Sequence, residues 1–271
     1  MELQIPKQGY DRPVEIAERI YWVGFHDEET NFHCNPYLIV EDGRAAVIDA
    51  GSRPDFPVVM LKIMQTGISP EQIAALIYQH PDPDLCGSMS NMVDLCASPD
   101  LEILSDPTNN IFLSYYLERE KRRLLRSVDE YGLTFSVNGR VLQFFKTPFA
   151  HSAGSFVTYD PRTKTLFTSD LFGSLSQEWD LFLKLDAECR RCSDTRRCQS
   201  RRPHCPLSDI MEFHKRVMPS EKSLQWAMNV ISGLDVQLIA PQHGSIVNRK
   251  EDIDLLADRL ANLKGVGIDG F

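Results

Sequence analysis

The chain has 271 residues, of which 42% are hydrophobic and 25% are charged, values typical of a globular protein with a substantial buried core. The formal net charge of −9 argues against general nucleic-acid binding, which needs a basic surface. No apolar run reaches the ~18 residues of a membrane-spanning helix, and the N-terminus does not resemble a signal peptide. We therefore expect a cytoplasmic protein with no nucleic-acid or membrane partner.

The first half of the chain alternates short apolar runs with helical patterns. A turn at Glu41-Asp42-Gly43 between two apolar runs is typical of a β-hairpin. Apolar residues three and four positions apart predict a helix over Phe56–Gln65 that ends before Gly67. We expect strands at Ile20–Gly24, Tyr37–Val40, Ala46–Asp49, Ile73–Tyr78 and Leu101–Leu104, and helices at Phe56–Gln65, Met89–Cys96 and Thr108–Tyr131, of which the last is the longest.

The second half repeats this order of β-rich and then helical segments. Strands are expected at Thr134–Val137, Arg140–Phe145, Ser155–Tyr159, Leu166–Thr168 and Val236–Ala240, and helices at Leu207–Met218, Glu221–Ser232 and Lys250–Leu263. Two such successions are typical of an α/β fold of the αββα sandwich type, in which two mixed β-sheets are flanked by helices. Because no long linker interrupts the chain, we expect residues 1–271 to form a single domain.

Three residues of metal-ligand type follow the predicted strand Ile73–Tyr78 at alternate positions, in the sequence His80-Pro81-Asp82-Pro83-Asp84. The two prolines disfavour a regular helix start or a central strand here. Alternate side chains of an extended loop point the same way, so His80 and Asp82 can share one ion while Asp84 reaches a second. Considered alone, the motif is explained equally well by a solvated acidic turn.

Further residues of metal-ligand type stand next to other predicted strands. His151 lies between two β-rich runs, Asp170 follows Leu166–Thr168, and His243 follows Val236–Ala240. Loops at strand ends can converge on one point of a β-scaffold. The candidate metal ligands are therefore His80, Asp82, Asp84, His151, Asp170 and His243.

This ordered set of six resembles the metallo-β-lactamase superfamily, from about Ile20 to Leu263. The other matching motifs are Val47-Ile48-Asp49-Ala50-Gly51, Thr168-Ser169-Asp170 and Pro241-Gln242-His243-Gly244. The resemblance implies a metallo-β-lactamase-type fold that holds two metal ions.

The first motif departs from the His-x-His-x-Asp-His pattern usual in the zinc hydrolases of this superfamily, because Asp82 replaces the second His and Leu85 the last. A carboxylate in place of an imidazole suits iron or manganese better than zinc. We therefore expect two iron ions, with zinc or manganese as alternatives. The set is similar to that of flavodiiron proteins and oxygen-binding di-iron proteins, which typically have Glu where this chain has Asp82. The His missing at Leu85 leaves one ion short of a ligand and open to a small molecule.

The flavodiiron resemblance also implies how the ligands divide between the two ions. One iron would bind to His80, Asp82 and His151. The other would bind to Asp84 and His243, and Asp170 would bridge the two.

The stretches Val23–Asp27 and Phe32–Leu38 are similar to the N-terminal region of flavodiiron proteins. They make His26 and His33 candidates for positions near the open coordination site, although surface histidines explain them equally well. Flavodiiron proteins also carry a flavodoxin domain with FMN. This chain reaches Phe271 directly after its last predicted helix, so we expect no FMN in it. An external donor protein would then supply electrons, and a homodimer is compatible with the sequence.

Residues 187–207 form a Cys- and Arg-rich insertion. Its four thiols, Cys189, Cys192, Cys198 and Cys205, follow the spacing C-x2-C-x5-C-x6-C among six Arg. Such a segment builds no apolar core, and a bound metal would order it. A zinc ion and an iron–sulfur cluster both fit, and a reduced basic loop or a redox pair at Cys189 and Cys192 are the alternatives. The Arg residues either offset the charge of a thiolate centre or form an anion site.

The remaining cysteines, Cys34, Cys86 and Cys96, are scattered, and we expect them to be buried as small hydrophobic residues. Cys86 is notable because it is two residues from Asp84. The charged run 118–123 is expected to be a solvated helix face rather than a nucleic-acid site.

The ligand set favours a binuclear non-haem iron protein that binds O2 or NO, either as a reductase fed by an external donor or as a gas or redox sensor. The alternative is a metal-dependent hydrolase of phosphodiesters or thioesters, in which two ions activate a bridging water. A non-enzymatic scaffold with a zinc-held docking element is a third interpretation. No catalytic side chain is assigned beyond the metal ligands.

Overall fold

The computed structural model describes residues 10–27, 32–176, 178–192 and 204–271. The chain divides into two compact units, Met1–Gln143 and Phe144–Phe271. Each unit is described by itself below, and the single domain expected from the sequence stays a prediction. In the described residues, no helix is both long enough and apolar enough to span a membrane.

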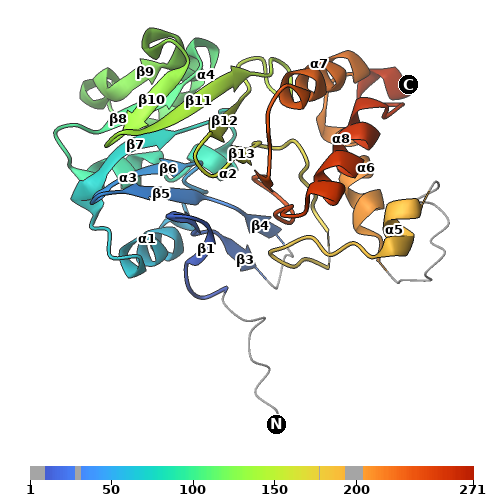
Figure 1. Cartoon of the computed structure of the whole chain (residues 1–271). Coiled ribbons are helices and arrows are strands. Elements are labelled where there is room, and N and C mark those ends of the chain that lie inside the picture. The colour runs from blue at the N-terminus through green and yellow to red at the C-terminus, as the bar shows by residue number, and fades with distance from the viewer. Residues whose placement is uncertain (1–9, 28–31, 177, 193–203) are drawn as a thin grey trace. The chain divides into compact units, whose positions relative to one another are not determined.

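The first unit is built on a seven-stranded mixed sheet with the strand order β1-β2-β5-β6-β7-β8-β9 (Figure 1). Its strands are β1 (Val14–Ala17), β2 (Ile20–Trp22), β5 (Tyr37–Glu41), β6 (Arg44–Ile48), β7 (Ile73–Ile77), β8 (Glu102–Ser105) and β9 (Leu125–Ser127). The strands from β6 to β9 are parallel. The loops that follow β6 and β7 therefore leave at the same edge of the sheet, which is where ligands bind in open α/β sheets.

Two hairpins and four helices complete the first unit. The hairpins join β3 (Phe25–Asp27) to β4 (Phe32–Cys34) and β10 (Thr134–Val137) to β11 (Arg140–Lys146), and the unit boundary falls within β11. The helices are α1 (Phe56–Gln65), α2 (Pro83–Cys86), α3 (Met89–Cys96) and α4 (Pro107–Leu113), with short 3₁₀ turns at Pro70–Gln72, Ser114–Tyr116, Arg119–Leu124 and Val128–Tyr131. The core of this unit includes Val59 and Ile63 of α1 together with Val47 and Leu76 of the sheet.

The long helix predicted at Thr108–Tyr131 is wrong. The helix α4 ends at Leu113, and β9 at Leu125–Ser127 adds a parallel strand beside β8. The charged segment Arg119–Leu124 forms a 3₁₀ turn in which no residue is buried. A helix through this segment would have no apolar face to pack, and strand pairing at the sheet edge overrides its helical propensity.

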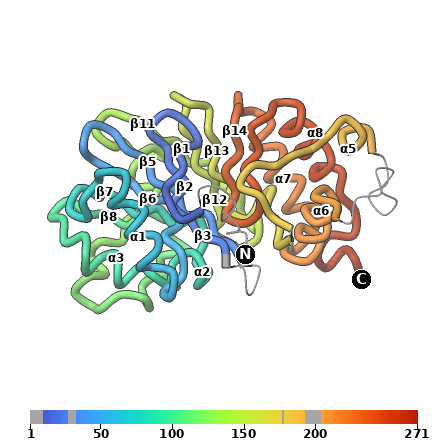
Figure 2. The backbone as a smooth tube through the Cα atoms, turned by 90° about the horizontal axis from the view of Figure 1, so that it is seen from below, coloured from blue at the N-terminus to red at the C-terminus, as the bar shows by residue number. Residues whose placement is uncertain are grey.

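The second unit contains β12 (Phe156–Asp160), β13 (Thr165–Phe167) and β14 (Leu238–Ala240), of which β12 and β13 are antiparallel and β13 and β14 parallel. Its helices are α5 (Ala187–Arg191), α6 (Pro206–Val217), α7 (Glu221–Ser232) and α8 (Lys250–Ala261), and a 3₁₀ turn, Ile268–Gly270, follows them. The helices α6, α7 and α8 lie side by side (Figures 1 and 2). Their apolar faces bury Ile210, Leu224 and Leu256 in one core with Ile239 of β14.

The α/β fold with two mixed sheets and flanking helices is confirmed. The second sheet has the order β10-β11-β12-β13-β14 and, like the first, combines parallel and antiparallel pairs. Most predicted elements match the observed ones to within two residues at each end, and four of them have the same bounds, namely Phe56–Gln65, Met89–Cys96, Thr134–Val137 and Glu221–Ser232. The strands β1, β3, β4 and β9 and the helices α2 and α5 were not predicted, because segments of three to five residues carry too little periodicity.

Candidate metal centre

The first candidate ligands lie in the loop that follows β7. The strand ends at Ile77, and Asp82 has an extended backbone directly before α2, which begins at Pro83. The expectation that the prolines disfavour a helix start here is wrong, because proline is tolerated in the first turn of a helix. The distance from His80 Nε2 to Asp82 Oδ2 is 3.6 Å. His80 is buried, whereas the side chain of Asp82 is 41% exposed. The two side chains are close enough to bind the same ion, given metal–ligand bonds of about 2.0–2.2 Å.

Buried groups of the same unit hold this loop in place. The Asp49 carboxylate, directly after β6, accepts a hydrogen bond from the backbone N–H of Gln79 at 3.0 Å. The Cys86 thiol donates to the carbonyl oxygens of Asp82 and Pro81, at 2.9 and 3.3 Å. Burial and nearby carboxylates raise the pKa of Cys86 to about 12. Cys86 therefore stays protonated at neutral pH and stabilises the ligand loop as a hydrogen-bond donor.

In the second unit, Asp170 lies between two histidines. Its Oδ2 is 3.0 Å from His151 Nε2, and its Oδ1 is 3.8 Å from His243 Nε2. All three side chains are at most 19% exposed. Each carboxylate oxygen thus faces a different imidazole. A carboxylate in this position could bridge two metal ions, each of which would also bind one of these histidines.

Strand pairing and backbone hydrogen bonds place these residues. Because β13 and β14 are parallel, the loops that carry Asp170 and His243 leave the sheet at the same edge. The backbone N–H of Gln242 donates to the Ser169 carbonyl oxygen at 2.7 Å and ties the two loops together. Ser169 has a φ of 55°, a left-handed conformation that turns the chain sharply after β13.

The loop after Asp170 is also held by a buried histidine of α6. The Phe172 amide donates to His214 Nε2 at 3.0 Å, and His214 Nδ1 lies 2.7 Å from the Ile210 carbonyl oxygen. Since Nε2 accepts, Nδ1 carries the proton and donates to Ile210. Burial lowers the pKa of His214 to about 4, so the ring is neutral at pH 7. His214 is therefore a positioning residue for the Asp170 loop.

The two histidines near the N-terminus meet on one hairpin. His26 and His33 are directly paired across β3 and β4, with 6.1 Å between their ring centroids. His33 is fully buried. Neither imidazole belongs to the candidate ligand set, and their placement beside an open coordination site stays a prediction.

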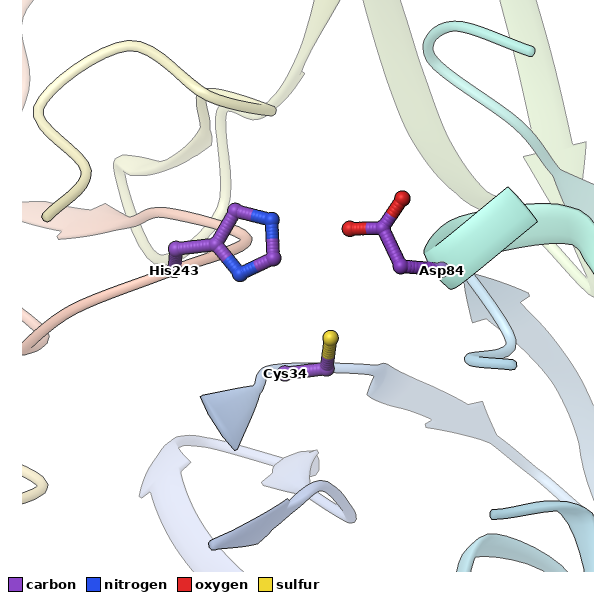
Figure 3. A group of neighbouring side chains, drawn as sticks. All are labelled: Cys34, Asp84 and His243. Carbon is purple, nitrogen blue, oxygen red and sulfur yellow. The ribbon is translucent and has the colours of Figure 1, made fainter. Parts of the chain in front are cut away.

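Cys34, the residue that follows His33, approaches a candidate ligand. A ligand oxygen of Asp84 lies within 4.8 Å of the Cys34 sulfur, and both residues belong to the first unit (Figure 3). His243, which Figure 3 also labels, comes from the loop that follows β14 in the second unit. As predicted, Cys34, Cys86 and Cys96 are all buried.

The Cys- and Arg-rich insertion is described only at its two ends, and Cys198 lies outside the described residues. Cys189 of α5 is 5% exposed and belongs to the apolar core of the second unit. Cys192 follows α5, and Cys205 directly precedes α6. Within 178–192 and 204–271, the three sulfurs of Cys189, Cys192 and Cys205 do not all lie within 4.8 Å of one another.

One arginine of this insertion has a structural partner. Arg190 forms a bidentate ion pair with Asp252 of α8, with Nε–Oδ1 and Nη2–Oδ2 distances of 2.6 and 3.2 Å. Asp252 is 1% exposed, so the guanidinium compensates a buried carboxylate. Arg190 therefore fastens α5 to α8.

Three residues that hold or adjoin the candidate ligands were not singled out from the sequence. Asp49 was noted only as part of a matching motif, and nothing in the pattern shows that it binds the Gln79 amide. His214 stands on a helix whose periodicity gives no sign of a loop contact. For Cys34 the sequence offers one indication of a place near the site, because Cys34 lies in a stretch similar to the flavodiiron N-terminal region.

A comparison with protein families identifies the fold family. The family model described as "ODP family beta lactamase" matches residues 32–244, a span that contains all six candidate ligands. The chain belongs to this family. The resemblance inferred from the motifs is therefore confirmed.

Solved structures share the fold of this ODP family member. The chemotaxis sensor ODP, solved as a peroxy diiron species, superposes with a TM-score of 0.73 at 23% identity and covers 95% of this chain and 97% of its own. The apo state of ODP from T. denticola gives a TM-score of 0.71 at 22% identity, over 95% of both chains. The rubredoxin oxygen:oxidoreductase from Desulfovibrio gigas gives 0.76 at 18% identity, over 93% of this chain and 61% of its own.

Curated relatives of this ODP family member are flavodiiron-type proteins. The type A flavoprotein fprA from Rhodobacter capsulatus is 26% identical over 250 residues, which are 88% of this chain and 53% of the relative. The nitric oxide reductase from Moorella thermoacetica is 29% identical over 174 residues, or 60% of this chain and 42% of the relative. The chain thus spans about half the length of the curated relatives it matches.

Proposed function

We propose that the six residues His80, Asp82, Asp84, His151, Asp170 and His243 bind two iron ions, with ligands from both units. The observation that carries this proposal is Asp170, whose two oxygens face two different imidazoles. In the proposed centre, Asp170 bridges the ions, His151 joins His80 and Asp82 on one ion, and His243 joins Asp84 on the other. The names of ODP and of the flavodiiron relatives support iron as the metal.

The donor set agrees with iron on chemical grounds. It contains three imidazoles and three carboxylates, and none of the six residues contributes sulfur. Carboxylate and imidazole together suit Fe²⁺ or Mn²⁺, whereas zinc sites favour nitrogen and sulfur. Zinc and manganese remain competitors that a metal analysis distinguishes.

We propose that the centre binds O2 or NO and that the protein is an oxidoreductase supplied with electrons by a separate donor, or a sensor that binds the gas reversibly. When bound, the two irons would offer an open coordination position for the gas and would pass on the electrons that the donor supplies. The chain's own groups position it: Cys86 and Asp49 hold the His80 loop, and His214 holds the Asp170 loop. The nitric oxide reductase and the ODP sensor among the similar proteins support this class.

The test is anaerobic purification followed by metal analysis and gas titration. We expect about two irons per chain and an absorption change that saturates at one O2 or NO per two irons. An Asp84→Asn variant should lose one iron and the gas-dependent change, and an exposed control, Asp254→Asn, should keep both. Two zinc ions with no response to either gas would contradict the proposal and make a metal-dependent hydrolase the working model.

We also propose that the insertion holds a second metal on Cys189, Cys192, Cys198 and Cys205, as zinc or as an iron–sulfur cluster. The support is the spacing of the four thiols. Zinc, iron and acid-labile sulfide per chain are measured in the wild type and in Cys192→Ser/Cys198→Ser. Loss of zinc, or of iron with sulfide, is expected in the variant. Unchanged metal content and colour would exclude the second metal.

A further inference from the structure

The side chain of Cys34 has a place beside the proposed centre that the six ligands do not account for. Cys34 ends β4 and is fully buried. Its sulfur lies within 4.8 Å of an Asp84 ligand oxygen, and Figure 3 shows the sulfur extending toward the region beside that carboxylate. One ion spans nearly this separation, since zinc bonds are about 2.3 Å to sulfur and about 2.0–2.2 Å to oxygen. We infer that Cys34 supplies a thiolate ligand to the metal ion that Asp84 binds.

The inference rests on the proposed di-iron function and concerns the ion with fewer protein ligands. In the proposed division, this ion has Asp84, His243 and the bridging Asp170. Leu85 stands where the superfamily's zinc hydrolases usually have a further histidine, and its side chain is fully buried and apolar. A fourth protein donor to this ion would have to come from another segment, and Cys34 is a soft donor within reach.

The backbone around Cys34 is held rigidly by its own unit. Cys34 pairs with Phe25 across the hairpin. Gly24 packs so closely that an added Cβ would lie 2.1 Å from the Cys34 carbonyl oxygen, which excludes any side chain there. The Trp22 indole donates to the Asn35 side chain at 2.8 Å. The backbone that carries the sulfur is thus held in place by its own unit before metal binds, as a preorganised ligand requires.

A buried lysine supports the same segment from α1. Lys62 Nζ donates to the Gly24 carbonyl oxygen and lies 4.2 Å from the centroid of the Trp22 ring. The side chain of Lys62 is 1% exposed. A charged group in this position orders the turn that precedes the hairpin, and through it the backbone of Cys34.

Binding involves one exchange at sulfur. The S–H bond of Cys34 breaks, a sulfur–metal bond forms, and the proton leaves to solvent. No oxidant or reductant is needed. Metal loading of the wild type should therefore release about one more proton per chain than loading of a variant that lacks the thiol.

The test uses metal-free protein reconstituted with Co²⁺, whose thiolate complexes give an intense near-ultraviolet charge-transfer band. The background is the full chain with Cys192, Cys198 and Cys205 changed to Ser, so that the insertion contributes no such band. In this background we expect the band with about two cobalt ions per chain. Cys34→Ser should abolish it, and Cys96→Ser, which removes another buried cysteine, should leave it unchanged.

A second measurement needs no change at Cys34. Zinc-edge X-ray absorption of the same background should show a sulfur neighbour at about 2.3 Å. Two bound ions without a sulfur neighbour and without the cobalt band would overturn the inference and leave the proposed centre intact. A protein that binds neither iron, cobalt nor zinc would instead refute the proposed centre, and this inference with it.

Discussion

The two units present their candidate ligands in different ways. In the first, His80, Asp82 and Asp84 share one short loop after β7, and Asp82 remains 41% exposed. In the second, His151, Asp170 and His243 come from three separate segments, yet Asp170 faces both histidines at 3.0 and 3.8 Å. The compact motif is easy to find in a sequence, but the dispersed set is the more organised in space.

The difference shows where preorganisation comes from. The loop of the first unit is held by a hydrogen bond that the Cys86 thiol donates and by one that the Asp49 carboxylate accepts, and loss of either should loosen ligands that are already adjacent in sequence. The second unit uses parallel strands to bring two loops to one edge, and a buried histidine fixes one of them. The proposed centre thus depends most on Asp170, and substitution of this residue is the first test of whether the second unit organises the ligands.

Changing Asp170 to Asn should have the largest effect, because in the proposed centre Asp170 is the carboxylate that serves both ions. We expect iron to fall from about two per chain to below one after anaerobic reconstitution and gel filtration. Asp84→Asn should lose only about one iron, and the exposed control Asp254→Asn should lose none. If Asp170→Asn retains two tightly bound ions, Asp170 is not the bridge.

Changing His214 to Ala tests whether the second unit is organised without metal. The variant leaves the Phe172 amide and the Ile210 carbonyl without their side-chain partner and opens a cavity. The free energy of unfolding of the metal-free protein should fall by about 2–4 kcal/mol in urea titrations at pH 7. Iron affinity should fall about 10–100-fold. The matched control is His204→Ala, which removes a partly buried histidine paired with Asp209 and should change neither quantity to this extent. A loss below about 0.5 kcal/mol would show that His214 does not support the loop.

The same histidine predicts how stability depends on pH. Burial lowers the pKa of His214 from 6.5 to about 4, so the unfolded chain binds the proton more tightly than the folded one. The contribution of neutral His214 to the free energy of unfolding should therefore be fully present above pH 6.5. It should be lost as the pH drops toward 4, by up to about 3 kcal/mol in total. Urea titrations of metal-free wild type and His214→Ala between pH 4.5 and 7 measure the slope. Equal slopes in both proteins would assign the pH dependence to other groups.

Cys86 tests the loop of the first unit and should give the smallest effect. Cys86→Val removes the thiol that donates to Asp82, so stability should fall by about 1 kcal/mol and iron affinity about tenfold. Cys86→Ser keeps a donor and should retain iron. Because its pKa is raised to about 12, Cys86 of the metal-free protein should resist alkylation at pH 8, while the more exposed Cys192 reacts. Rapid labelling of Cys86 in folded protein would contradict this role.

Strand ends and spacing were enough to predict much of the fold and to nominate the ligands. The pattern around His80 stands out because alternate ligand residues separated by prolines are unusual, and most strands could be placed from their apolar runs. The failure at Thr108–Tyr131 has a tertiary cause, since residues 125–127 pair with β8 in spite of their helical surroundings. The contacts of His214 and Asp49 arise only when distant segments pack, so local pattern could not reveal them.

The most direct test of the account is iron-edge X-ray absorption on anaerobically reconstituted protein, combined with iron analysis. A centre bridged by Asp170 predicts about two irons per chain and an iron–iron distance of about 3.5–4 Å, which the Asp170→Asn variant should lose. Iron bound without an iron neighbour, or the same iron–iron distance in Asp170→Asn, would contradict the claim that ligands from both units form one dinuclear centre.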